Sequence, residues 1–145
     1  MSDQRWLVYA LLSAVCAALV GIFAKPGLRE VEPNLGTAIR SIVMTVLLVG
    51  FITATRGWAR LPAINSRASL FILLAGAAGA ASWLFFFNAL KLADVSSVAP
   101  IDKLSTPIAV ILATLILGER HSWQNWVGVA VMVAGAYLVA LRPAH

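Results

Sequence analysis

The amino-acid sequence predicts an all-α membrane protein with five transmembrane helices. Of its 145 residues, 61% are hydrophobic and 12% are charged, whereas a soluble domain carries about 25% charged residues. The mean hydropathy is +0.89. The apolar residues form long runs between short polar connections. Because a membrane-spanning helix needs about 20 mainly apolar residues, these runs predict the fold class.

The first three predicted helices are uncharged apart from one arginine. The first covers residues 6–24 and is ended by the segment Lys25-Pro26-Gly27. The second covers residues 35–55 and carries Arg40 near its start. The third covers residues 68–90 and contains no charge. These spans are therefore as apolar as the bilayer interior requires.

The last two predicted helices differ from each other. The fourth covers residues 95–118 and contains two prolines and two opposite charges. These residues are Pro100, Asp102, Lys103 and Pro107. The fifth covers residues 123–141 and is uncharged. Because the connections are too short to hold a soluble domain, we expect residues 1–145 to form a single transmembrane domain whose function lies among its helices.

The distribution of basic residues indicates how the chain faces the membrane. Five spans place the two termini on opposite sides. The Lys and Arg residues outside the helices divide five to four, with the larger number on the N-terminal side. The positive-inside rule therefore favours a cytoplasmic N-terminus by a single charge. A bias this small permits insertion in both orientations, and the alternative is an ordinary protein with its N-terminus inside.

Three charged residues lie within predicted spans, where a charge is costly and usually faces a cavity or a partner. Arg40 lies five residues into the second helix, about 7.5 Å deep at the rise of an α-helix. Asp102 lies six residues beyond Ser96, about 9 Å deep from the same side. These depths predict an Arg40–Asp102 ion pair, direct or closed through bound water or substrate. The alternative is a packing clamp, with Lys103 reaching toward lipid headgroups.

The two prolines of the fourth helix add free backbone groups beside these charges. Pro100 cannot donate a hydrogen bond to the carbonyl of Ser96, and Pro107 cannot donate to that of Lys103. We therefore expect both carbonyls to be unpaired and the helix to break between the prolines. Broken helices of this kind are typical of transporter binding sites near the middle of the membrane.

The third helix places aromatic side chains at a similar depth. Trp83 lies about 10 Å from the end of that helix by helical rise, and Phe87 follows four residues later on the same face. Both are candidates to line a cavity, and the alternative is that they face lipid or the helix core. Asn88 is a candidate for a hydrogen bond between helices.

Small residues on the fifth helix indicate a packing face. Gly128 and Gly135 are seven residues apart and share one side of the helix. Such faces allow two helix backbones to approach closely. We therefore expect Gly128 and Gly135 to form a contact between subunits.

Several classes of function find no support in the sequence. The chain has one cysteine, Cys16, and its two histidines lie at a turn and at the terminus, so we expect neither a metal site nor a cofactor. No hydrolase, zinc-protease or nucleotide-binding motif occurs, which argues against an enzyme. The basic residues lie mainly between apolar runs, where they suit lipid headgroups rather than nucleic acid.

Several short segments together resemble an EamA domain. They are the A-P-I-D-K-L-S run at residues 99–105, L-G-E-R at 117–120, the glycines at 128 and 135, K-P-G-L at 25–28 and T-A-I-R at 37–40. The resemblance covers nearly the whole chain. The chain is most similar to the five-span bacterial and archaeal branch of the drug/metabolite transporter superfamily, and it resembles one EamA-type unit of an inverted-repeat transporter.

The resemblance implies a location, a partner and a class of substrate. Larger relatives join two five-helix units in inverted orientation and move metabolites, usually outward, through a cavity between them. This implies that the present chain works as an antiparallel homodimer in the inner membrane of a bacterium or archaeon. The related small multidrug exporters use an acidic residue in their first helix. Here that helix offers only Tyr9, Ser13 and Cys16 as polar groups, which argues against cationic-drug export of that kind.

We therefore predict a transporter of small metabolites that works by alternating access, with export favoured over import. Arg40 and Lys103 outnumber Asp102 within the spans, which favours an anionic or zwitterionic solute. Two alternatives remain. One is a flippase for a lipid-linked substrate, and the other is a non-transporting subunit of a larger membrane complex.

Overall fold

The computed structural model describes residues 5–140, except for the side chains of residues 60 and 63. Over this range the chain forms five helical segments that are long and apolar enough to cross a membrane. They are Arg5–Gly27, Pro33–Ala54, Ser66–Leu92, Val95–Leu117 and Trp123–Ala140. The predicted all-α class with five spans is confirmed. Within the described residues, the ends of the segments differ from the predicted ends by three residues at most. The predicted end of the fifth span, at residue 141, lies outside the described residues.

The first two helices, α1 (Arg5–Gly27) and α2 (Pro33–Ala54), show why the predicted ends shift. Helix α1 continues three residues beyond the predicted end at residue 24 and stops at Gly27, within the Lys25-Pro26-Gly27 segment that was expected to end it. Helix α2 begins two residues earlier than predicted. Glu32 has an extended backbone, and its Oε2 accepts a hydrogen bond from the Leu35 N–H at 2.9 Å. Proline suits the first helical position that follows such a cap.

The fourth span is interrupted, as the sequence predicts. Helix α4 (Val95–Asp102) ends at the break, and α5 (Ser105–Leu112) begins after Leu104. A π-helical turn, η2 (Ala113–Leu117), completes the span. It stops at Gly118, whose φ of +69° is a conformation that glycine adopts without strain.

The chain divides into two compact units. We call them the terminal unit, Met1–Lys25 with Leu92–His145, and the central unit, Pro26–Lys91. A single transmembrane domain over residues 1–145 stays a prediction.

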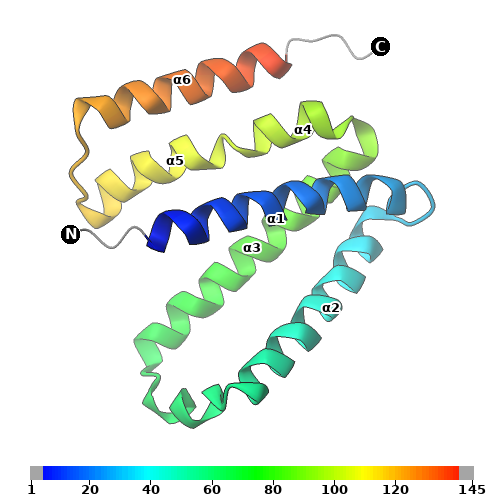
Figure 1. Cartoon of the computed structure of the whole chain (residues 1–145), viewed down its shortest axis with the longest axis vertical. Helices are drawn as coiled ribbons and strands as arrows, with labels where there is room; N and C mark the ends of the chain where they lie inside the picture. The colour runs from blue at the N-terminus through cyan, green and yellow to red at the C-terminus, as the bar shows by residue number, and fades with distance from the viewer. Residues whose placement is uncertain (1–4, 141–145) are drawn as a thin grey trace. The chain divides into compact units, whose positions relative to one another are not determined.

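The terminal unit is built around α6 (Trp123–Ala140), which packs along α4 and α5 (Figure 1). Ala136 is the buried residue of α6. At the end of α1, the Lys25 Nζ donates a 2.6 Å hydrogen bond to the Ala93 carbonyl. The same nitrogen lies 3.7 Å from the Asp94 carboxylate. These contacts join the end of α1 to the turn that precedes α4.

The central unit contains α2, the short 3-10 helix η1 (Gly57–Ala63) and α3 (Ser66–Leu92). Its buried side chains gather where the start of α2 meets the end of α3: Leu28, Pro33, Thr37, Phe87 and Leu90. The Lys91 Nζ donates hydrogen bonds to the carbonyls of Leu28 and Arg29. This lysine therefore holds the connection between α1 and α2 against the end of α3.

Most large apolar side chains of the five spans are exposed. In the most apolar stretch of each span, only 6% of the residues are buried within the chain. Exposed surface of this extent and hydropathy is stable in lipid and not in water. The protein is therefore a multi-pass membrane protein.

Candidate functional site

Arg40 and Trp83 form a stacked pair between α2 and α3. The Arg40 Cζ lies 3.6 Å from the centroid of the Trp83 ring, and 6.0 Å from that of Phe87. Arg40 begins the third turn of α2, seven residues after Pro33, which is about 10.5 Å along the helix. A guanidinium over an indole face is a cation–π contact. The sequence predicts both residues in the site but not this contact.

Other aromatic side chains of α3 support the indole. The Trp83 ring meets the rings of Phe86 and Phe87 edge to face, at centroid distances of 5.5 and 5.9 Å. Phe87 is only 4% exposed. The predicted neighbourhood of Trp83 and Phe87 is therefore present, with Phe87 buried beside the stack. That the two side chains line a cavity stays a prediction. The position of the indole is fixed by packing within one helix and against the next.

Polar contacts and one glycine fix α2 against α3 beside the stack. The Asn88 Nδ2 donates to the Asn34 Oδ1 at 2.9 Å, which is the hydrogen bond between helices predicted for Asn88. The buried Thr37 hydroxyl donates to the Pro33 carbonyl at 2.9 Å. A Cβ at Gly36 would lie 3.1 Å from a methyl group of the buried Leu28. Glycine therefore permits the close packing that brings Arg40 to Trp83.

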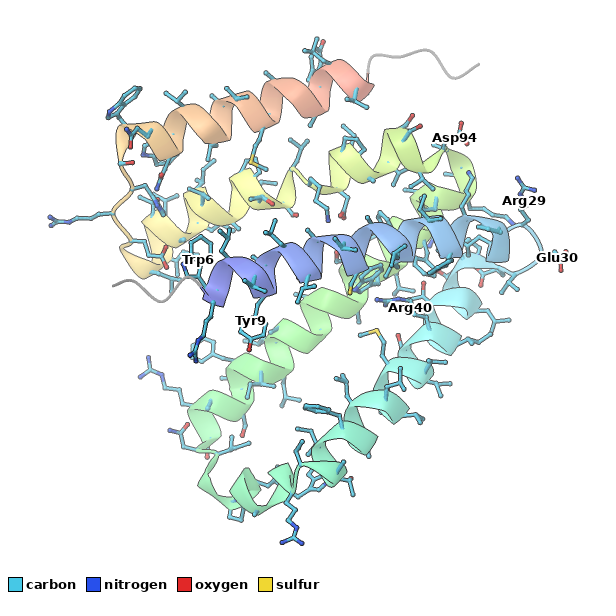
Figure 2. The ribbon with its side chains drawn as sticks, in the orientation of Figure 1. Trp6, Tyr9, Arg29, Glu30, Arg40 and Asp94 are labelled. Carbon is cyan, nitrogen blue, oxygen red and sulfur yellow. The ribbon has the colours of Figure 1, made fainter. Side chains whose placement is uncertain are left out.

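The stack does not balance the charge of Arg40. A cation–π contact contributes about 0.5–2 kcal/mol, whereas arginine at the centre of a spanning helix costs about 2.5–3.5 kcal/mol. Within the described part of the central unit, no hydrogen bond or ion pair engages the guanidinium. In Figure 2, Arg29 and Glu30 lie at the outer side of the preceding loop, and Arg40 points the other way. Arg40 is thus a half-buried cation with an aromatic partner and no anion in its own unit.

Asp102 and Lys103 form an ion pair at the break of the fourth span. The Lys103 Nζ lies 3.2 Å from the Asp102 Oδ2. The side chain of Lys103 is 58% exposed and that of Asp102 is 32% exposed. Sequence neighbours point about 100° apart on a helix, but the long lysine side chain bends back to its neighbour. Both charges therefore have a partner within the terminal unit.

The backbone at the break corrects one prediction. We expected the carbonyls of Ser96 and Lys103 both to be unpaired. The Lys103 carbonyl instead accepts a hydrogen bond from the Thr106 N–H at 3.0 Å, because the chain turns more tightly after the break. Pro107, itself buried, follows this turn. Pro100 still deprives the Ser96 carbonyl of its usual helical donor.

The predicted Arg40–Asp102 ion pair involves one residue from each unit. Asp102 lies seven residues after the start of α4, about 10.5 Å along the helix. The pair itself stays a prediction.

Gly128 and Gly135 lie exposed on α6. A Cβ at either position would meet no atom of the chain within 4 Å. Their role in a contact between subunits stays a prediction. Among residues 5–140, no group of three or more His, Cys, Asp or Glu side chains is placed to hold a metal ion.

Sequence reasoning missed the residues that hold the site together. Gly36, Thr37 and Lys91 act through packing and backbone contacts, which neither the depth of a residue in its span nor its charge reveals. The available signals were weak. Glu32 and Pro33 form a recognisable start of a helix, and a lysine near a helix end commonly binds backbone carbonyls.

Comparisons with known proteins agree with this architecture. The model of the EamA-like transporter family matches residues 4–141. A protein of Sinorhizobium sp, named "Uncharacterized transporter in cobO 3'region", is 44% identical over 139 residues. The match covers 96% of this chain and 99% of the relative. No solved structure matches the chain. The protein is therefore a membrane transporter, and the chain belongs to the EamA-like transporter family.

Proposed function

We propose that this protein moves small metabolites across the inner membrane of a bacterium or archaeon by alternating access. In this proposal two copies in opposite orientations form the working unit, and the solute moves outward. The solute is anionic or zwitterionic. The observation that carries the proposal is the interrupted fourth span, with Asp102 and Lys103 at the break.

The break supports transport because it places polar groups where a spanning helix normally has none. Asp102 and Lys103 neutralise each other at 3.2 Å, which lowers the cost of two charges within a span. The Ser96 carbonyl lacks its helical donor because Pro100 has no N–H. A solute that approaches the break finds exchangeable ion-pair and hydrogen-bond partners. Discontinuous helices serve in this way in other transporters.

Arg40 and Trp83 supply the second part of the proposed site. Arg40 lacks an anionic partner within the described central unit and is held on an aromatic platform. In the proposed cycle, solute or protons rearrange an ion pair between Arg40 and Asp102. Trp83 and Phe87 provide an apolar wall, and the Asn88 hydrogen bond fixes the helices behind it. Pro100 and Pro107 keep the break in place.

Two features of the sequence support the antiparallel homodimer. With an odd number of spans, the two ends of each chain lie on opposite sides of the membrane, so a chain can insert in either of two orientations. The five-to-four division of basic residues between the two sides hardly favours one of these orientations. A reporter fused to the C-terminus tests this directly. We expect signal from both sides of the membrane. Signal from one side alone would exclude the antiparallel homodimer.

Transport is tested with purified protein in proteoliposomes and radiolabelled anionic and zwitterionic metabolites. We expect Asp102→Asn and Lys103→Ala to abolish most of the uptake, because each leaves the other charge unpaired within a span. Glu30→Gln removes an exposed carboxylate from a loop and serves as the matched control. Full uptake by both site variants would contradict the assignment. Movement of lipid-linked sugars alone would indicate a flippase, and no movement at all would indicate a non-transporting subunit.

A further inference from the structure

We propose that the stacked Arg40 guanidinium binds the carboxylate of a monocarboxylate solute that also has an apolar body. This inference rests on the proposed function and names the chemical group that the site recognises.

The distance between Arg40 and Trp83 determines where the guanidinium donors point. The Cζ lies 3.6 Å from the ring centroid, which is the contact distance of two carbon atoms. At this distance no N–H group fits between the two, so the guanidinium lies flat on the indole. Its N–H donors then point along the plane of the ring and away from it. A planar fork of donors in this position matches the two oxygens of one carboxylate.

The other charged groups of the central unit leave this fork without a partner. The Glu32 carboxylate accepts from the Leu35 N–H at the start of α2. Figure 2 places Glu30 at the outer side of the loop. Arg40 therefore presents donors in an apolar span with no carboxylate from the described residues of its own unit. Asp102, for its part, has Lys103 as its partner in the terminal unit. An incoming carboxylate supplies the missing acceptor.

The number of positive charges favours a monoanion over a phosphate ester. The Lys91 ammonium is engaged by the carbonyls of Leu28 and Arg29. The Arg29 side chain points away from Arg40 in Figure 2. Arg56 follows Arg40 by sixteen residues, and Arg67 precedes Trp83 by sixteen residues, which is about 24 Å in each case by helical rise. Among the described side chains of this unit, the Arg40 guanidinium is therefore the one positive charge at the stack. One positive charge matches a solute with a single negative charge.

The surroundings of the stack favour an apolar body on the solute. The Trp83 ring makes edge-to-face contacts with the rings of Phe86 and Phe87. The polar Asn88 side chain is already bonded to Asn34 and to the Leu84 carbonyl. A solute whose carboxylate reaches Arg40 therefore meets hydrocarbon around it. Polar substituents on the solute would lose their hydration without finding partners.

The first test uses wild-type protein in phosphatidylcholine vesicles and needs no substitution. Phenylglyoxal modifies accessible guanidinium groups, and mass spectrometry of the peptide that contains Arg40 gives the rate. We expect phenylacetate and isovalerate to slow modification of Arg40 at least tenfold. Phenylacetamide and isovaleramide, which have the same shape without the charge, leave the rate unchanged. Arg29 is the internal control and reacts at one rate throughout.

A second test uses variants and the dissociation constant of phenylacetate. Arg40→Lys keeps the charge and loses the planar fork, so we expect binding at least tenfold weaker. Trp83→Phe keeps an aromatic platform and weakens binding less. Arg29→Lys is the matched control and binds as the wild type does. Thermal unfolding of each variant shows whether it is folded.

Three outcomes would overturn the assignment. The first is equal protection of Arg40 by the acids and their amides. The second is no protection by either acid. The third is that phosphatidylglycerol, used in place of phosphatidylcholine, protects Arg40 from phenylglyoxal while phenylacetate does not. That result would make Arg40 a site for lipid headgroups. These experiments measure binding and not transport. If the protein binds phenylacetate at Arg40 but moves no solute, the proposed function is refuted, whereas the carboxylate site at Arg40 stands.

Discussion

The stack of Arg40 on Trp83 makes a quantitative prediction about stability. Trp83→Leu removes the cation–π contact, which contributes about 1–2 kcal/mol at a partly desolvated site. It also removes two edge-to-face contacts with Phe86 and Phe87, each worth about 0.5–1.5 kcal/mol. We therefore expect Trp83→Leu to lower the free energy of unfolding by roughly 2–5 kcal/mol. Trp83→Phe keeps an aromatic face over which the guanidinium can stack and costs less.

A double-mutant cycle isolates the part that belongs to Arg40. The variants are Arg40→Gln, Trp83→Leu and the two combined, and the free energy of unfolding is measured in bicelles. If the stack is formed in the membrane, the coupling energy between the two sites is about 1–2 kcal/mol. A second cycle pairs Arg40→Gln with Trp58→Leu as the control. Trp58 donates its indole hydrogen bond to Thr53 at 2.9 Å, in the last turns of α2.

The comparison of the two cycles decides the outcome. Distant substitutions add to within about 0.5 kcal/mol, so the Trp58 cycle should show no coupling beyond that limit. A coupling this small for Arg40 and Trp83 would refute the stack. A large coupling in both cycles would indicate a general loss of structure rather than a specific contact.

Two further predictions concern the packing around the site, and a third concerns the predicted contact between subunits. Lys91→Met removes the hydrogen bonds that hold the α1–α2 loop, which together stabilise the loop by about 1.5–3 kcal/mol. The rate of amide hydrogen exchange at residues 28–32 should therefore rise at least about tenfold. Arg29→Met is the control and should leave this rate unchanged. Gly36→Val should lower the free energy of unfolding by about 1–3 kcal/mol, because a Cβ at this position would lie only 3.1 Å from the buried Leu28 side chain. The measurement is unfolding by urea in detergent. The control is Gly50→Val in the same helix, where a Cβ has open space. Gly128→Leu should reduce cross-linked dimer without changing the unfolding free energy, and an unchanged dimer fraction would remove this residue from the subunit contact.

The fold class and the spans were accessible to sequence reasoning because hydropathy decides them. Long apolar runs have one stable form in lipid, which is a helix with its hydrogen bonds satisfied internally. The ends of the helices depend on single side chains. Glu32 caps α2, and this moves its start to Pro33. Hydropathy does not register such contacts, so the predicted starts and ends shift by up to three residues.

The site was predicted residue by residue but not contact by contact. Helical rise gives the depth of Arg40 and Trp83 in their spans, and depth brought both into one candidate site. It does not give the direction in which each side chain points. The sequence argument therefore paired Arg40 with the opposite charge at similar depth, whereas within the central unit its partner is an aromatic ring. Likewise, Lys103 pairs with its own neighbour because its side chain is long enough to bend back.

The two polar clusters carry different net charges, and this difference has a functional consequence. Asp102 and Lys103 neutralise each other, so the break in the fourth span carries no net charge. The cluster at Arg40 carries one positive charge that aromatic rings hold but do not neutralise. An anion therefore gains most at Arg40, where it supplies a missing partner, whereas at the break it must displace one that is already bound. In the proposed transport cycle, selection by charge therefore belongs to the central unit. The interrupted backbone at the break is, in the same proposal, the place where a helix bends as the solute passes.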